Sequence, residues 1–205
     1  LANAVKERGL TLHLKAGTYV VPKTQIITDL SQVSGRFDLI AFTMKAYDTV
    51  TTIYSLQAQE NLLQTPIISF QNGIGNEEDL QEAFGAEMIV AGTVTTPVSI
   101  RSTTEIVEEQ ERGIAIASDS AAADIVLQAF QNTTVRVDTT ASSLSLKWSK
   151  LLLNILGNAS SAILDMLPDE VYASSSLFAI ERAAFREALV ILQQMKIPII
   201  NLPGM

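Results

Sequence analysis

The residues best suited to chemistry lie in the segment 146–161, LKWSKLLLNILGNASS. In a helix, at about 100° per residue, the polar and small residues of this segment share one sector and apolar residues cover the rest. That sector contains Lys147, Lys150, Asn154, Gly157, Asn158 and Ser161. Lys150 can offer a proton, and the amides of Asn154 and Asn158 can offer hydrogen bonds to a small oxygen-rich ligand. A solvated face of an amphipathic helix has the same pattern, so periodicity leaves both interpretations open.

The composition excludes several other kinds of site. The chain has 205 residues, of which 47% are hydrophobic, and a net charge of -8 that opposes binding to nucleic-acid phosphates. It has no cysteine and only one histidine, His13, so disulfides, thiolate chemistry and the usual metal sites are not expected. No apolar run approaches the ~20 residues of a membrane span, and no signal peptide is recognisable. We therefore expect neither nucleic acid nor membrane as a partner, and a cytoplasmic location.

The elements that position the segment 146–161 are predicted to be alternating strands and helices. Apolar runs of strand length occur at 37–44, 67–70 and 88–94, and helical segments separate them. This β-α-β-α-β order is typical of a doubly wound α/β domain with parallel, buried strands. Beyond it, the segments 100–107 and 113–117 are predicted to pair as an antiparallel hairpin. From residue 140 the pattern is helical only, so we predict one domain at 1–139 and a second, all-helical domain at 140–205.

Two polar residues stand at the carboxyl ends of predicted strands, where open α/β sheets bind their ligands. Lys45 follows the first strand and Asn72 follows the second. Lys45 fits either an ordinary exposed residue or a cation that meets a phosphate or a ribose. Gly73 and Gly75 allow a sharp turn close to a ligand. They do not form a phosphate-binding loop, because the third glycine is missing and three carboxylates follow at 77–79.

Taken together, three segments resemble the ketopantoate reductases, NADPH-dependent enzymes that reduce 2-dehydropantoate to pantoate on the way to coenzyme A. These segments are FDLIAFTMKAYDT, PIISFQNGIGNEEDL and WSKLLLNILGNASSAI, in the order and spacing typical of the family. The resemblance extends along essentially the whole chain. It implies a partial Rossmann-like NADP-binding domain followed by the start of a helical domain. It also implies a small 2-keto acid as substrate, and it leaves a homo-oligomer open.

The resemblance implies a role for each candidate residue. Lys45 would lie by the adenosine end of NADPH, and Asn72 would lie near the nicotinamide ribose and the substrate. Lys150 would donate the proton, and Asn154 and Asn158 would hold the substrate. This is coherent chemistry, because hydride delivered to a ketone carbon leaves charge on the oxygen, which an ammonium group can stabilise and protonate.

Two parts of the family pattern are not found in this sequence. The family opens with a GxGxxG loop after its first strand, and it has a serine and a glutamate beyond the position of Met205. We therefore expect a fragment that by itself binds NADPH weakly and is inactive. Two other functions stay open: another NAD(P)-dependent dehydrogenase acting on a hydroxy acid or a sugar phosphate, and a non-catalytic nucleotide-binding module.

Overall fold

The computed structural model describes residues 2–21 and 25–205. The strands are β1 (Leu10–Leu14), β2 (Gly17–Val21), β3 (Ile40–Phe42), β4 (Ile67–Ser69), β5 (Ile89–Val94), β6 (Val98–Ser102), β7 (Glu105–Glu108), β8 (Ile114–Ala117) and β9 (Val137–Thr140). The helices are α1 (Ala2–Arg8), α2 (Thr49–Gln57), α3 (Asn76–Phe84), α4 (Ala123–Phe130), α5 (Ser143–Ile155), α6 (Asn158–Leu164), α7 (Pro168–Ala173) and α8 (Ser175–Met195). Short 3-10 turns occur at Leu30–Gln32, Ala46–Asp48, Glu60–Leu62 and Ala86–Met88.

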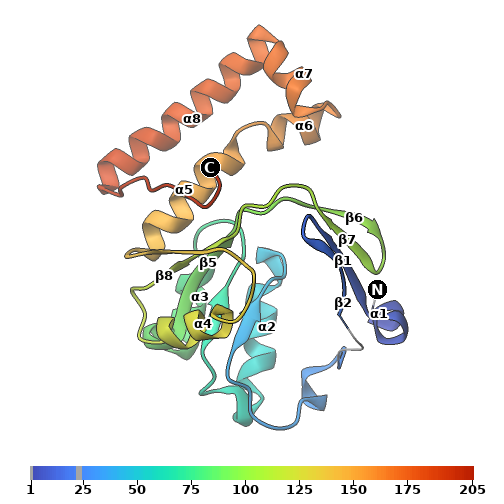
Figure 1. Ribbon diagram of the computed structural model, residues 1–205. Helices are drawn as coiled ribbons and strands as arrows, with labels where there is room; N and C mark the ends of the chain where they lie inside the picture. The colour runs from blue at the N-terminus through green and yellow to red at the C-terminus, as the bar shows by residue number, and fades with distance from the viewer. Residues whose placement is uncertain (1, 22–24) are drawn as a thin grey trace.

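The described strands form two sheets. The larger has the order β3-β4-β5-β8-β9, in which β3, β4 and β5 are parallel, β8 is antiparallel to β5, and β9 is parallel to β8. The smaller has the order β2-β1-β7-β6 and lies beside it in Figure 1. Parallel strands separated by α2 and α3 confirm the predicted α/β class. The carboxyl ends of β3, β4 and β5 therefore lie at the same end of the larger sheet.

Helices cover the two faces of the larger sheet because side chains alternate along each strand. On β4, Ile67 packs in a cluster with Leu56 of α2 and Leu80 of α3. The next residue, Ile68, packs in a separate cluster with Val126 of α4. Both isoleucines are almost completely buried, so the run 67–70 is the doubly covered strand that its composition predicts.

The run 37–44 is less buried than predicted. Only Ile40–Phe42 forms the strand β3, which lies at the edge of the described sheet and pairs with β4 alone. Phe42 is buried, whereas Ala41 is exposed and Ile40 is half-buried. An apolar run alone does not distinguish an edge strand from a central one, and this accounts for the error.

The predicted hairpin of 100–107 with 113–117 is wrong. Instead β6 pairs with β7 through a tight turn at 103–104, and β8 joins the larger sheet between β5 and β9. The chain thus leaves the large sheet after β5, forms the β6-β7 hairpin, and returns with β8. This path places the charged turn 108–112 just before β8, close to the carboxyl end of β5.

The helical part of the chain rises from the sheet along α5, and α8 is its longest helix (Figure 1). One face of α5 contacts α8 through a cluster that includes Leu152, Ala188 and Leu192. Residues 197–205 then run back along α5, where the Ile200 amide donates to Ser149 Oγ at 3.0 Å and Leu202 joins the sheet core. None of the described helices combines the length and apolar character needed to cross a bilayer.

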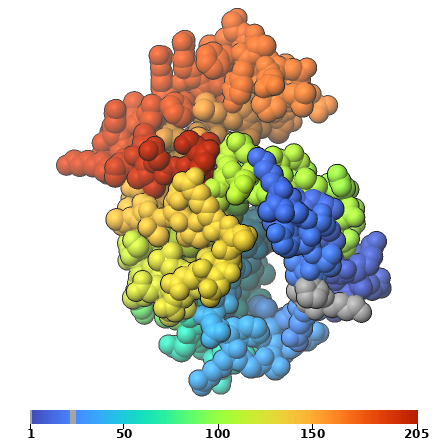
Figure 2. Space-filling model, in the orientation of Figure 1, coloured from blue at the N-terminus to red at the C-terminus, as the bar shows by residue number. Residues whose placement is uncertain are grey.

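Figure 2 shows the molecule hollowed between the amino-terminal hairpin, in blue, and the segment near residue 135, in yellow. An apolar groove of about 340 Å³ lies there, lined by residues that include Leu12, Ile106 and Val135. The groove separates the two sheets over part of their length. None of the candidate residues lines it.

Candidate active site

Helix α5 is fixed to the sheet at its first turns. Ser142 caps the helix, because its side chain accepts from the Ser145 amide at 3.2 Å. One turn later Leu146 is fully buried in a cluster with Ala91 of β5 and Ala115 of β8. Small alanines on these strands let the helix approach closely. The residues that follow Leu146 are therefore held over the end of the sheet.

The turn after β4 carries Asn72 and is tied together by a polar network. The buried Gln71 donates through Nε2 to the Met44 carbonyl at 3.2 Å and to Thr49 Oγ1 at 2.8 Å. Asn76 donates back to the Asn72 carbonyl at 3.1 Å. Gly75 precedes α3 with φ 101°, a left-handed conformation that favours glycine. This network links the turn after β4 to the loop after β3, and it leaves Asn72 exposed.

Asn72 and Asn154 meet, although they are 82 residues apart. Asn154 Nδ2 donates to Asn72 Oδ1 at 3.3 Å. Asn154 belongs to α5 and is half-buried, whereas Asn72 belongs to the turn after β4. Two of the candidate residues therefore come from separate elements and lie next to each other.

The two lysines of the predicted polar sector differ in exposure and in partners, although burial lowers the pKa of both. Lys147 is 5% exposed, and its Nζ donates to the carbonyls of Ser69 and Gln71 at 3.1 and 2.8 Å. The same Nζ lies 2.7 Å from Glu77 Oε1. An ammonium has three protons, so these three acceptors use all of them. The interpretation of this sector as a solvated face is thus wrong at Lys147.

Lys150 lies one turn further along α5 and is half-buried. Within the described ranges its ammonium has no hydrogen-bond or ion-pair partner. Burial lowers the pKa of Lys150 below the usual lysine value because it disfavours the charged form, and the positive charge of Arg112 acts in the same direction. Lys150 therefore carries a proton that is available and easier to release than that of an exposed lysine.

The segment 146–161 is not one continuous helix, because the helix breaks before it reaches Asn158. Helix α5 ends at Ile155, Gly157 takes a left-handed conformation with φ 77°, and α6 begins at Asn158. Glu181 of α8, which is 4% exposed, holds this bend by accepting from the Gly157 amide at 2.7 Å and from Ser160. These hydrogen bonds lower the pKa of Glu181. Asn158 is exposed and stands on a different helix from Lys150 and Asn154.

Lys45 follows β3 at the end of the sheet where β4 also ends, and its side chain is exposed. The preceding carbonyl, that of Met44, is the one that Gln71 binds. The carboxyl ends of the parallel strands thus carry both Lys45 and Asn72, as the sequence predicts. Among the described residues, the Lys45 side chain makes no hydrogen bond or ion pair with the other candidates.

Sequence reasoning missed four residues that shape this place. The sequence does not single out Arg112, yet its charge acts on Lys150. Glu77 was counted among carboxylates that repel phosphate, yet it pairs with Lys147. Gln71 and Glu181 were not considered. A basic residue directly before a glycine and a strand is a weak signal for Arg112, whereas nothing local to Glu181 indicates the bend that it holds.

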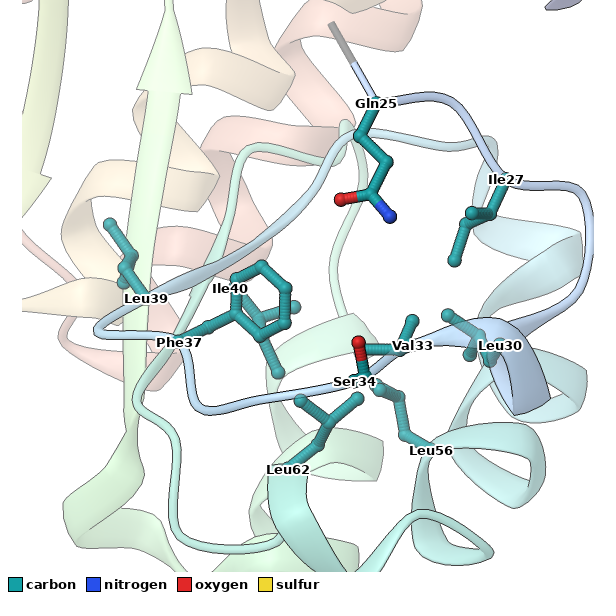
Figure 3. Close-up of a pocket in the computed structure, with 10 residues that line it drawn as sticks. All are labelled: Gln25, Ile27, Leu30, Val33, Ser34, Phe37, Leu39, Ile40, Leu56 and Leu62. Atoms are coloured by element: carbon teal, nitrogen blue, oxygen red, sulfur yellow. The ribbon is translucent and has the colours of Figure 1, made fainter.

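A separate apolar pocket of about 320 Å³ lies between the segment 25–37 and the elements β3 and α2. Figure 3 shows its lining, which includes Phe37, Leu39, Ile40 and Leu62. Leu39 and Ile40 lie at the amino end of β3, and Leu62 lies in the turn that leads to β4. The pocket is therefore at the opposite end of these strands from Asn72, apart from the candidate site.

Two family models match this chain. The model of ketopantoate reductase PanE/ApbA matches residues 1–120, which is more than half of the chain. The chain belongs to the ketopantoate reductase family. A second model, ketopantoate reductase PanE/ApbA C terminal, matches residues 143–202, the helical part. The resemblance recognised in the sequence is thereby confirmed.

Individual relatives agree with this family. A 2-dehydropantoate 2-reductase of Halobacterium salinarum is 30% identical over 168 residues, which cover 79% of this chain and 54% of the relative. The chain thus spans about half the length of that curated relative. The crystal structure of a 2-dehydropantoate 2-reductase from Geobacter metallireducens has a TM-score of 0.80 at 23% identity, covering 91% of this chain and 63% of the other. A D-mandelate dehydrogenase in ternary complex with NADH and anilino(oxo)acetate has a TM-score of 0.80 at 17% identity, covering 97% and 64%.

Ketopantoate reductases are NAD(P)H-dependent oxidoreductases, and the turn after β4 leaves open space for a bound ligand. A Cβ built at Gly75 meets nothing within 4 Å, so there is space beside the Asn72 turn. Gln71 Oε1, next to Asn72, is buried without a hydrogen-bond partner among the described residues. The pyrophosphate does not fit the start of α3, where Glu78 and Asp79 are exposed carboxylates. No three metal-ligating side chains gather within the described ranges.

Proposed function

We propose that the complete protein is a cytoplasmic enzyme of pantothenate and coenzyme A biosynthesis that reduces 2-dehydropantoate to pantoate with NADPH. One observation carries the proposal: beside the contact of Asn72 with Asn154, Lys147 has three acceptors and Lys150 has none. A ketone reduction needs one proton donor at such a place. Lys150 meets this need, because its ammonium is half-buried and unengaged.

In the proposed reaction the 2-keto acid lies between the sheet part, 1–139, and the helical part, 140–205. NADPH, when bound, would supply the hydride for the ketone carbon, and negative charge would then develop on the ketone oxygen. The Lys150 ammonium stabilises that oxygen and gives it a proton, and water restores the proton to Lys150. Asn154 and Asn158 hold the hydroxyl and carboxylate through uncharged hydrogen bonds, while Asn72 and Lys45 would hold NADPH at its nicotinamide ribose and its adenosine end, respectively.

The test is an assay of the complete protein with a panel of 2-keto acids and both cofactors. Oxidation of NADPH is followed by its absorbance, and the product is identified by mass spectrometry. We expect 2-dehydropantoate to give the highest kcat/KM, and NADPH to be preferred over NADH. The second candidate is a dehydrogenase for another 2-hydroxy acid, which the likeness to D-mandelate dehydrogenase favours. A higher kcat/KM for phenylglyoxylate than for 2-dehydropantoate would decide for that candidate, and a preference for NADH would overturn the proposed cofactor alone.

Asn154→Ala and Asn158→Ala are expected to raise the KM for the keto acid more than they lower kcat. Each removes a hydrogen bond to the bound substrate, at a cost of about 1–3 kcal/mol. Steady-state kinetics at saturating NADPH measure the effect. Gln194→Ala, at an exposed position of α8, is the control and should leave KM unchanged. An unchanged KM in both asparagine variants would remove them from the substrate site.

The pH dependence of reduction should report the lowered pKa of Lys150. The donor must be protonated, so kcat/KM falls as pH rises through this pKa, at a lower pH than for an ordinary lysine. Arg112→Gln removes a positive charge, which raises the pKa and moves the fall to higher pH. Arg101→Gln, on the exposed strand β6, is the matched control. A profile that moves equally in both variants, or in neither, would contradict the influence of Arg112 on Lys150.

A further inference from the structure

Lys147 has more partner residues than any other cation among the residues that the structure describes. Its ammonium donates to two carbonyls, Ser69 at the last residue of β4 and Gln71 just beyond. It also pairs with Glu77 in the first turn of α3. The three acceptors enclose the turn 72–76 from both sides. Lys147 therefore joins α5 to the end of β4 and to the start of α3.

The same helix contacts the turn a second time. Asn154 lies seven residues after Lys147, two helical turns along the same face of α5, and it donates to Asn72 at 3.3 Å. Lys150 lies between these two contacts. A helix held at both positions cannot shift along its axis or rotate without breaking one of them. Of the two contacts, that of Lys147 is buried and shielded from water. It therefore contributes more to holding α5 in place.

Building on the proposed function, we propose that Lys147 is a positioning residue that clamps the Asn72 turn to α5 and so sets the place of Lys150 and Asn154 relative to that turn. Lys147 does not contact substrate, because its three protons are already used. Its role is to keep the proton donor and the substrate-holding amide in register with the strand ends. Small displacements in such an arrangement are costly, because reacting groups must be aligned within a fraction of an ångström.

The experiment replaces Lys147 in the complete protein by methionine, which has similar length and no donor. Hydrogen–deuterium exchange without substrate should be faster in the peptide 71–76 and unchanged in α4. The kcat/KM for 2-dehydropantoate should fall by about 10-fold or more, since a misplaced site loses up to 10²-fold. Asn154→Ala should then cost much less in the Lys147→Met background than in the wild type, because its partner has already moved.

The matched control is Val126→Ala, a buried position of α4 on the other face of the sheet. If it lowers kcat/KM as much as Lys147→Met, the effect is general destabilisation and the proposal is overturned. Unchanged exchange at 71–76, unchanged kcat/KM, or strict additivity with Asn154→Ala would each overturn it too. Should Lys147→Met not fold, Lys147→Met/Glu77→Leu replaces the whole pair by apolar side chains and gives the same measurements. The exchange experiment uses no substrate. It therefore tests whether Lys147 holds the turn 72–76 to α5 even if the protein does not reduce 2-dehydropantoate.

Discussion

Lys150→Ala is expected to lower kcat for ketone reduction on the order of 10²-fold or more, the usual scale for removal of a positioned acid. The reason is that charge on the substrate oxygen then has no cation to stabilise it and no proton at hand. NADPH affinity should change little, because the proposed role of Lys150 lies at the ketone. Steady-state kinetics give kcat, and quenching of NADPH fluorescence gives the affinity.

The control for this variant cannot be Lys147, whose removal disturbs a buried pair. Lys196→Ala is suitable, because Lys196 is exposed at the carboxyl end of α8. It should leave both kcat and NADPH affinity as in the wild type. A Lys150→Ala enzyme with near-normal kcat would show that another group gives the proton, and the assignment would fail.

Leu146→Ala is expected to lower the free energy of unfolding by about 2–5 kcal/mol, the range for emptying a buried leucine site. Leu146 is fully buried between α5 and the alanines of β5 and β8, and these small residues cannot fill the space left behind. The midpoint of urea unfolding measures the change. Because this contact seats α5 on the sheet, kcat/KM should fall as well.

Leu144→Ala is the matched control on the same helix. Leu144 is 39% exposed, so its loss leaves little cavity and should cost far less than the loss of Leu146. Equal destabilisation by the two substitutions would mean that α5 does not depend on the Leu146 contact for its place.

Much of the fold could be predicted from local patterns, and the errors have physical causes. The run 67–70 predicted a doubly covered strand, and Ile67 and Ile68 do pack on opposite faces. Strand pairing was mistaken after β5, because alternation indicates a strand but not its partner. The end of α5 was missed for a related reason. Gly157 is compatible with a helix or with a left-handed break, and only Glu181, from a distant helix, selects the break.

The candidate site could also be predicted only in part. The sequence pointed to Asn72 and Asn154 separately, and the structure brings them to 3.3 Å. It placed Lys147 and Lys150 on one polar sector, but periodicity does not tell a side chain in water from one that is buried with polar partners. The difference between the two lysines depends on Ser69, Gln71 and Glu77, which come from another part of the chain.

The left-handed bend at Gly157 separates the proposed proton donor from one of the proposed substrate ligands. Lys150 is carried by a helix seated on the sheet, whereas Asn158 begins a helix whose orientation is set by Glu181 of α8. Mutations in α6 can therefore tilt Asn158 with less effect on Lys150 than mutations in α8, which packs against α5. If the proposed function holds, substitutions at the bend are the place to begin in changing the keto acid specificity.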